Sequence, residues 1–351
     1  MSHEKLNVAL IGAGRFGAKR ASAVAKSLRS KLAIVADIDP GSARAVGEAY
    51  GCRWTIDWRT AATDAGIEAV AVATPTRQLA LIGLQAVEAG KHVLVEKPCA
   101  ATTSELLALV EAARANHTVL KGGYNHRFHP AIRRAHELFV EGAIGRPVFL
   151  RCIYGHGGRV GYENEWRSQA ALSGGGELLD QGVHALDLFR WFLGEFEEAA
   201  GMVSTAFWPI APAEDNAFVL LRNRDGIVAQ LHASWTHWKN AFSFEVFGEK
   251  GYLRTTGLGG SYGPERLCCG LRARPGEAPH DNWIDFAGPD SSLTAEWEEF
   301  LDAVAEGREP ASNGLDAWRT LQLAEAVYRS AREGHRVQVA GAPAHDRLHA
   351  G

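Results

Sequence analysis

The sequence has little cysteine, little methionine and no apolar run long enough to cross a membrane. Its five cysteines are odd in number and irregularly spaced, and none lie in a C-x-x-C motif. This pattern argues against a disulfide framework and against a cysteine metal cluster, so we expect reduced thiols and a cytoplasmic location. The segment after Met1 has no basic stretch followed by an apolar one, so no signal peptide is expected.

The charge balance excludes further classes of protein. The formal net charge is -4, and no block of lysine and arginine occurs, so nucleic acid and membrane surfaces are not expected partners. Hydrophobic residues make up 46% and charged residues 22%, which is typical of a globular protein. A length of 351 residues suggests about two domains.

A glycine-rich turn follows the first apolar segment, 6–11, and precedes a predicted helix over 14–28. In Gly12-x-Gly14-x-x-Gly17 the first glycine permits a tight turn, and the second lets the backbone approach a pyrophosphate. The third permits close packing of helix and strand, and the helix N-terminus favours an anion. The turn therefore predicts a dinucleotide site, to which Arg15 and Phe16 also contribute.

Residues 1–123 alternate between predicted strands and helices. Strands are expected over 31–37, 69–74, 93–95 and 119–122, with helices between them. Asp39-Pro40 is a good helix start, and Thr102-x-x-Glu105 is typical of a capping box. This alternation predicts an α/β domain with a doubly wound parallel sheet.

Asp37 ends the second predicted strand, where an acid can accept hydrogen bonds from both ribose hydroxyls. Ile38 follows it, so no adjacent arginine is present to neutralise a 2′-phosphate. We therefore favour NAD over NADP, although Arg15 or Arg44 could still reach a phosphate. Asp39 is the rival acid, but its place before Pro40 indicates a helix cap.

Glu96-Lys97-Pro98 ends the apolar run 92–95, which is predicted to be a buried strand. Ligands bind at the carboxyl edge of such a sheet, and a charged pair is costly there unless it has a use. The pair predicts an oxidoreductase site rather than a nucleotide-binding fold alone.

The pattern changes in residues 124–351, the predicted second domain. Extended runs over 147–154, 199–208, 216–222, 227–235, 242–248 and 252–256 predict an open, mainly antiparallel sheet. The glycine- and proline-rich segment 257–290 is predicted to be a long loop. Three consecutive glycines, 174–176, precede a predicted helix that ends near Leu193.

Asp180 and His184 lie four residues apart on that helix and so share one face. A carboxylate and an imidazole on a largely buried helix can fix each other's orientation and pass a proton. A purely structural pair is the alternative. Arg127 and the Trp166-Arg167 pair could bind substrate or form salt bridges.

These residues resemble those of the glucose–fructose oxidoreductase / inositol dehydrogenase / rhizopine catabolism (Gfo/Idh/MocA) family along nearly the whole chain. The segments that carry the resemblance are 12–17, 73–75, 89–93, 96–98, 127–130 and 174–187. The resemblance implies a Rossmann domain followed by an α/β domain with an open sheet, and a homodimer or homotetramer formed through that sheet.

The resemblance also implies residue roles. Lys97, Asp180 and His184 correspond to the catalytic set, with either Lys97 or His184 as the formal base. The cofactor would contact Gly12, Gly14, Arg15, Phe16, Gly17, Asp37, Ile38, Thr74, Pro75, Glu96 and Lys97. The substrate would contact Lys97, Arg127, Tyr154, Trp166, Arg167, Asp180 and His184.

The resulting hypothesis is an NAD(P)-dependent oxidoreductase acting on a secondary alcohol or ketone of a sugar, sugar derivative or cyclitol. One alternative is redox-neutral, NAD-assisted glycoside cleavage. Another is a regulator that senses a sugar or NAD without catalysis, although such relatives tend to lose the catalytic set. No metal is expected, because the histidines show no ligand spacing and the cysteines form no cluster.

Overall fold

The computed structural model describes residues 5–339, which form two compact units. The first unit takes the described residues up to Asn125, with Ala171–Gly174 and Ser291–Trp318. The second takes His126–Ala170, Gly175–Asp290 and the described residues from Arg319 on. The predicted boundary between a cofactor-binding domain, 1–123, and a substrate-binding domain, 124–351, stays a prediction.

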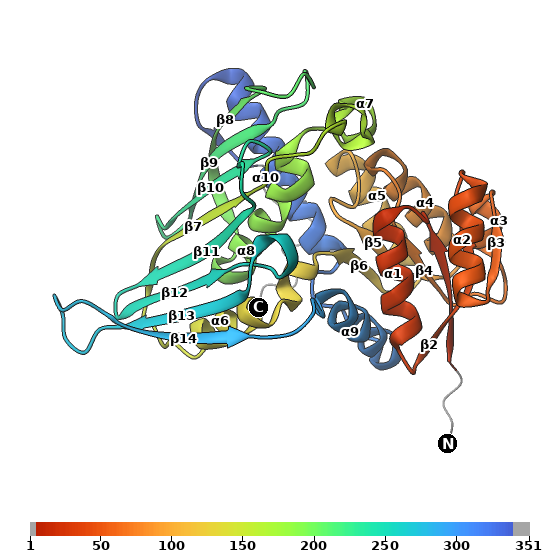
Figure 1. The fold of residues 1–351 in the computed structure, drawn as a ribbon, viewed down its shortest axis with the longest axis horizontal. Helices are drawn as coiled ribbons and strands as arrows, with labels where there is room; N and C mark the ends of the chain where they lie inside the picture. The colour runs from red at the N-terminus through yellow and green to blue at the C-terminus, as the bar shows by residue number, and fades with distance from the viewer. Residues whose placement is uncertain (1–4, 340–351) are drawn as a thin grey trace. The chain divides into compact units, whose positions relative to one another are not determined.

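The first unit contains a parallel sheet of six strands in the order β3-β2-β1-β4-β5-β6 (Figure 1). Its apolar strands are covered by helices on both faces, which confirms the predicted doubly wound fold. The strands are β1 (Leu6–Ile11), β2 (Ser30–Ala36), β3 (Arg53–Thr55), β4 (Ala69–Val72), β5 (His92–Glu96) and β6 (Leu120–Gly123).

Local signals set the helix boundaries of this unit. Asp39 accepts a hydrogen bond from the backbone of Ser42, and Thr102 and Glu105 form the predicted capping box. The helices are α1 (Arg15–Lys26), α2 (Pro40–Tyr50), α3 (Trp58–Thr63), α4 (Thr76–Glu88), α5 (Thr103–Ala115) and α9 (Ser292–Glu306).

The second unit contains a sheet of nine strands in the order β14-β13-β12-β11-β7-β10-β9-β8-β15. β7 and β10 pair in parallel and the other neighbours pair antiparallel, so the predicted open, mainly antiparallel sheet is confirmed. The strands are β7 (Pro147–Gly155), β8 (Phe196–Ser204), β9 (Asn216–Asn223), β10 (Val228–Ser234), β11 (Ala241–Gly248), β12 (Gly251–Thr256), β13 (Glu265–Leu271), β14 (His280–Phe286) and β15 (Val337–Gln338).

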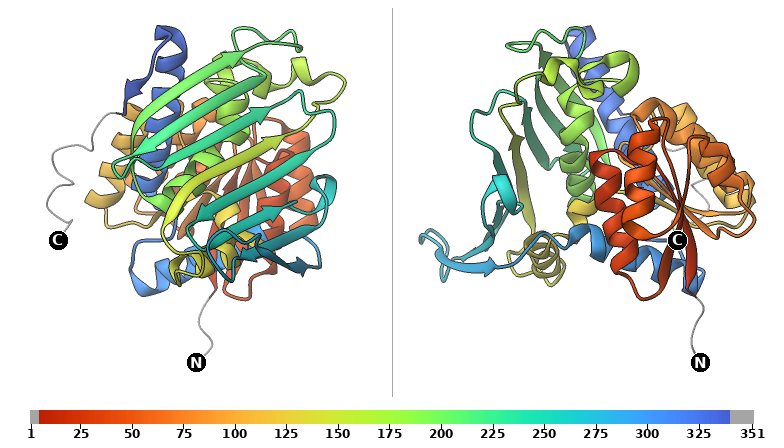
Figure 2. Two further views of the ribbon diagram at one scale, coloured as in Figure 1. Left: turned by 90° about the vertical axis from the view of Figure 1, so that its left-hand side faces the viewer. Right: turned by 45° about the vertical axis from the view of Figure 1, so that its right-hand side comes forward.

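One face of this sheet is buried and the other is open (Figure 2, left). Residues alternate along β9, so that Val219 and Leu221 are buried while Phe218 and Leu220 are about half exposed.

The remaining helices are α6 (Pro130–Val140), the short α7 (Ala170–Ser173), α8 (Val183–Leu193) and α10 (Gly314–Glu333). Of these, α7 and α10 each have residues in both units. Short turns are η1 (Asn125–Phe128), η2 (Tyr162–Asn164), η3 (Trp166–Ser168), η4 (Leu178–Gly182) and η5 (Gly260–Tyr262).

The prediction of a long loop over 257–290 is wrong. β13 and β14 form a hairpin in this segment, in which Leu267 pairs with Ile284. Most of the turn-forming residues that suggested a loop lie outside the two strands: 257–264 precede β13, and Pro275 and Gly276 lie in the connection between β13 and β14. Pairing of β13 with β12 extends the sheet and outweighs the weak strand propensity of the segment.

Among residues 5–339, no helix is both long enough and apolar enough to cross a membrane.

Candidate active site

The glycine-rich turn joins β1 to α1 in the first unit. Gly12 has φ +97°, and a Cβ there would lie 2.3 Å from the carbonyl oxygen of Ala73, so only glycine fits. Gly14 is the N-cap of α1, and because it has no side chain it does not cap the first amides of the helix. The first amides of α1 therefore suit the pyrophosphate of a dinucleotide.

Asp37 lies immediately after β2, beside this turn. Its Oδ2 accepts a hydrogen bond of 2.6 Å from the Ala13 amide, and its Oδ1 accepts one of 2.9 Å from the Asp39 amide. Asp39 is the cap of α2, and its bonds to the side chain and backbone of Ser42 lower the pKa of its carboxyl. Ile38 is 86% exposed next to Asp37. Asp39 is thus engaged in capping α2, and the role of Asp37 towards a ribose stays a prediction.

Thr74 and Pro75 follow β4 at the same carboxyl edge of the sheet. Thr74 Oγ1 is buried and makes no hydrogen bond within the described part of the chain, so a cofactor group could use it. Glu96 ends β5, and Lys97 follows as a half-buried residue with a cis peptide bond to Pro98. Arg15 is exposed on the first turn of α1, and Phe16 is half-buried. The predicted cofactor residues of this unit therefore gather along one sheet edge.

In the second unit the three glycines pack closely against another segment. A Cβ on Gly176 would lie 2.0 Å from the carbonyl oxygen of Glu214. The Glu214 carboxylate accepts bonds from the amides of Gly176 (2.9 Å) and Leu178 (3.0 Å) and from Tyr328 Oη (2.7 Å). The glycines therefore fix the start of the following helix.

That helix begins with the π-helical turn η4, which carries Asp180, and continues as α8, which carries His184. π-helical turns occur often at functional sites. His184 is 6% exposed, and its ring stacks on that of His126, with centroids 3.8 Å apart and planes at 20°. His126 Nε2 lies 3.1 Å from Tyr154 Oη, and burial raises the pKa of Tyr154 well above its usual value. His184 is thus held in a rigid aromatic group.

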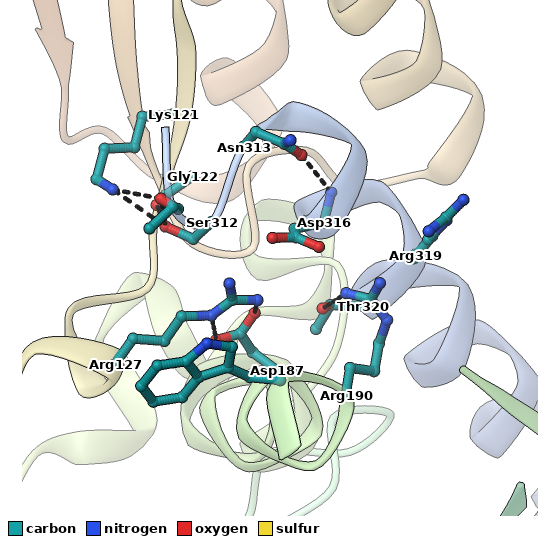
Figure 3. A network of polar contacts seen from close by, with 12 residues as sticks. Lys121, Gly122, Arg127, Asp187, Arg190, Ser312, Asn313, Asp316, Arg319 and Thr320 are labelled. Carbon is teal, nitrogen blue, oxygen red and sulfur yellow. Dashed lines mark hydrogen bonds and ion pairs between the residues drawn. The ribbon is translucent and has the colours of Figure 1, made fainter. Parts of the chain in front are cut away.

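Arg127 forms a buried ion pair with Asp187 of α8 (Figure 3). Its Nε donates to Oδ2 at 2.8 Å and its Nη2 donates to Oδ1 at 2.6 Å, while Asp187 is 0% exposed. This two-bond geometry is a strong one for a guanidinium and a carboxylate. The salt-bridge interpretation of Arg127 therefore has direct support.

Replacing Asp187 with asparagine is expected to lower the free energy of unfolding by about 3 kcal/mol, because Arg127 would keep a buried charge without its counter-charge. Chemical denaturation of both proteins measures the difference. Glu48→Gln is the control, since Glu48 pairs with Arg44 on an exposed helix face, and it should change little. Equal stability of the Asp187→Asn variant and the parent would contradict this assignment.

Arg167 is the arginine nearest to Asp180 among the predicted substrate residues. Its Nε lies 3.4 Å from Asp180 Oδ1, and its guanidinium lies 4.6 Å from the ring centre of Trp166. Arg159 instead pairs with Glu165, with Nε and Oε1 2.7 Å apart. Arg167 Nη1 also lies 3.9 Å from Glu165 Oε2, so Arg159 and Arg167 share the Glu165 carboxylate, whereas Arg127 is paired with Asp187.

Three potential metal-ligating groups converge near Asp180. Ligand atoms of His156, Glu177 and Asp180 lie within 4.8 Å of one another. However, His156 Nδ1 accepts a 2.9 Å hydrogen bond from the Gly158 amide, so the neutral ring carries its proton on Nε2. That tautomer makes His156 a hydrogen-bond donor and not a metal ligand. The absence of a metal stays a prediction.

Tyrosines complete this part of the second unit. Gln181 Nε2 donates to Tyr262 Oη at 2.9 Å, and the Tyr262 ring packs against that of Tyr154 at 5.5 Å. Tyr162 is 1% exposed, and its ring lies 5.7 Å from that of His156. Burial raises the pKa of Tyr154, Tyr162 and Tyr262, and the negative charge of Asp180 acts on each of these tyrosines in the same direction.

Two family profiles match most of the chain. Residues 6–124 match the oxidoreductase family with an NAD-binding Rossmann fold, and residues 132–254 match the GFO/IDH/MocA C-terminal domain. The chain belongs to the Gfo/Idh/MocA family.

Related proteins align with nearly the whole length of this Gfo/Idh/MocA protein. The levoglucosan dehydrogenase of Pseudarthrobacter phenanthrenivorans is 27% identical, over 96% of this chain and 98% of that protein. The inositol 2-dehydrogenase of Rhizobium meliloti is 28% identical, over 94% and 98%. Among solved structures, levoglucosan dehydrogenase in complex with NADH and levoglucosan has a TM-score of 0.88 and 25% identity, over 96% of this chain and 100% of that one.

Membership of the Gfo/Idh/MocA family confirms the predictions of an oxidoreductase and of a nicotinamide cofactor. The glycine-rich turn fits such a cofactor, and so does Thr74 Oγ1, which has no hydrogen-bond partner among residues 5–339. Sequence reasoning did not assign roles to His126 and Tyr262. His126 directly precedes the segment 127–130, but its stacking on His184 joins residues 58 positions apart (184 − 126), which spacing does not reveal.

Proposed function

We propose that this protein is an NAD-dependent dehydrogenase that acts on a secondary alcohol of a sugar, sugar derivative or cyclitol. The observation that carries the proposal is the environment of His184. Its ring is buried, stacked on His126, and one helical turn from Asp180. The names of the relatives, which include levoglucosan and inositol dehydrogenases, support the substrate class.

In the proposed cofactor site, the first amides of α1 hold the pyrophosphate and Asp37 accepts hydrogen bonds from the adenosine ribose. Thr74, Glu96 and Lys97 lie at the carboxyl edge of the sheet, where a doubly wound fold binds its ligand. When bound, the nicotinamide ring accepts or gives the hydride.

The proton is handled by residues of the chain itself. Lys97 donates a hydrogen bond to the reacting oxygen and polarises it, and His184 accepts the proton that the alcohol loses. Asp180 binds a substrate hydroxyl and orients His184. Arg167, at 3.4 Å from Asp180, and Tyr154, bonded to His126, keep the two groups in place.

A screen of sugars and cyclitols with NAD, followed by NADH absorbance, tests the proposal. The expected result is steady NADH formation with at least one member of the panel and none without substrate. Glycosides in the same panel test the alternative activity, redox-neutral glycoside cleavage. Glycoside cleavage with no net NADH, in a protein that retains its cofactor, would overturn the dehydrogenase assignment.

The choice of NAD over NADP can be measured by fluorescence titration with NADH and NADPH. We expect NADH to bind at least about tenfold more tightly, because the Asp37 carboxylate repels a 2′-phosphate. In Asp37→Ala the ratio of the two dissociation constants should fall towards one. Asp57→Ala is the control, since Asp57 caps α3 and should leave the ratio unchanged. Tighter binding of NADPH to the parent protein would contradict the role of Asp37.

We also propose that two or four copies associate through the open face of the nine-stranded sheet. Large apolar side chains stand on this face, where Phe149 stacks on Phe247 at 4.4 Å and Phe218 stacks on His232 at 4.2 Å. Met202 is 76% exposed beside them. Exposed apolar side chains of this size favour an interface, although the Arg151–Glu245 ion pair lies on the same face.

Light scattering coupled to size exclusion tests the association. Phe218→Lys is expected to shift the protein to the monomer, because it would bury a charge at the centre of the interface. Leu28→Lys, on an 85% exposed residue of the other unit, should keep the mass of the parent. A monomeric parent protein would exclude this interface.

The five cysteines are free thiols, which supports the expected cytoplasmic location.

A further inference from the structure

One arginine and two carboxylates are buried together in the first unit. Arg20 of α1 is 1% exposed, Glu96 at the end of β5 is 6% exposed, and Glu296 of α9 is 0% exposed. Arg20 Nε donates to Glu96 Oε1, and Arg20 Nη1 lies 2.5 Å from Glu296 Oε2. The three residues are far apart in the sequence but meet between the helix of the glycine-rich turn and the strand that leads to Lys97.

The surroundings leave this cluster little freedom. A Cβ on Gly123 would lie 3.0 Å from Arg20 Nη2 and 3.1 Å from Glu96 Cα. α9 is fixed in turn by Trp297, which is fully buried and donates a 3.0 Å hydrogen bond to Ser30 Oγ. Backbone and side chains therefore hold the Glu96 carboxylate on the α1 side of its strand.

Arg20 is paired with both carboxylates. Burial raises the pKa of the Glu296 carboxyl, and the negative charge of Glu96 acts in the same direction, against the opposing charges of Arg20 and Lys121. Arg20 stays charged, because the carboxylates of Glu296 and Glu96 raise its pKa by more than burial lowers it. A buried ion pair of this kind adds little net stability compared with apolar packing, so a role other than stability is expected.

We propose that Arg20 is a positioning residue for Lys97, acting through Glu96. Glu96 and Lys97 share a peptide unit, so fixing the Glu96 side chain limits the directions open to the Lys97 ammonium. Arg20 also neutralises the Glu96 carboxylate, which would otherwise compete with the substrate oxygen for that ammonium. This inference rests on the proposed role of Lys97 in the dehydrogenase reaction.

The test compares Arg20→Met with Lys121→Met. Lys121 is a matched control, because it is 0% exposed in the same unit and bonds Glu299 at 2.5 Å and the backbone of Ala311. Its charge also acts on Glu296, so its loss removes a cation from the same surroundings but leaves the Arg20–Glu96 contact in place. Both variants remove a buried cation and keep an unbranched side chain. For each we would measure the midpoint of unfolding, the Kd for NADH, kcat, and KM for the substrate found in the screen.

Both variants should lose stability, but only Arg20→Met should lower kcat, by about 10- to 100-fold. Its Kd for NADH should stay within about threefold of the parent value. Arg20→Lys keeps the charge and should recover part of kcat. Arg20→Gln, which also removes the charge, replaces Arg20→Met if that variant does not fold. A normal kcat in the folded Arg20→Met or Arg20→Gln variant, or an equal loss of kcat in Lys121→Met, would overturn the positioning role.

Failure of the positioning role of Arg20 can be distinguished from failure of the proposed dehydrogenase function. If Lys97→Ala keeps its turnover, the role of Lys97 is wrong and the positioning role falls with it. If Lys97→Ala is inactive while the Arg20 variants keep kcat, the dehydrogenase proposal stands and the positioning role alone is overturned.

Discussion

Replacing Lys97 with alanine is expected to reduce turnover by about 10³-fold or more, with the Kd for NADH within about threefold of the parent value. The side chain is proposed to act on the reacting oxygen and not on the adenosine half of the cofactor. Loss of a positioned donor of this kind typically costs 10²- to 10³-fold, and loss of proton transfer adds to it. Stopped-flow or steady-state measurement of NADH formation, with a separate fluorescence titration, gives both numbers.

The control for this substitution is Lys26→Ala. Lys26 is the exposed last residue of α1, so its loss should leave kcat and NADH affinity unchanged. Turnover within tenfold of the parent in Lys97→Ala would remove Lys97 from the catalytic set. A large loss of NADH affinity in Lys97→Ala would instead assign the residue to cofactor binding.

The first unit could be predicted well because its signals are local in the sequence. The glycine-rich turn, the Asp39 cap and the capping box of Thr102 each act within a few residues, and the structure contains all three. Continuous apolar runs such as 69–72 indicate strands buried on both faces, which only a covered parallel sheet allows. The alternation of helix and strand predicted the doubly wound class, but the strand order and the short β3 and α3 are known only from the structure.

The second unit was harder because pairing between strands outweighs local preference. β13 contains Gly270 and lies between proline-rich turns, yet the backbone hydrogen bonds of β12 and β14 hold it extended. Contacts between residues that are far apart in the sequence could not be predicted either. Nothing in the sequence pairs Arg20 with Glu296, because the contact depends on how α9 packs against α1.

His184→Gln is expected to lower kcat by about 10²- to 10⁴-fold, the range that proton transfer by a side chain contributes. Glutamine keeps a polar side chain of similar reach but cannot accept and release a proton at neutral pH. The comparison is made under substrate saturation, so that loss of substrate binding appears in KM and not in kcat.

His136→Gln is the matched control for this substitution. His136 also stacks on an aromatic ring, with its centroid 3.7 Å from that of Trp191, but it lies on α6 and bonds the carbonyl oxygen of Trp191. Its replacement should cost stability and spare kcat. Lys97 and His184 both remain candidates for the formal base, and comparing Lys97→Ala with His184→Gln distinguishes the two possibilities. A near-normal kcat in His184→Gln together with an inactive Lys97→Ala would assign the base to Lys97, and the stacked His184 would then serve to shape the site.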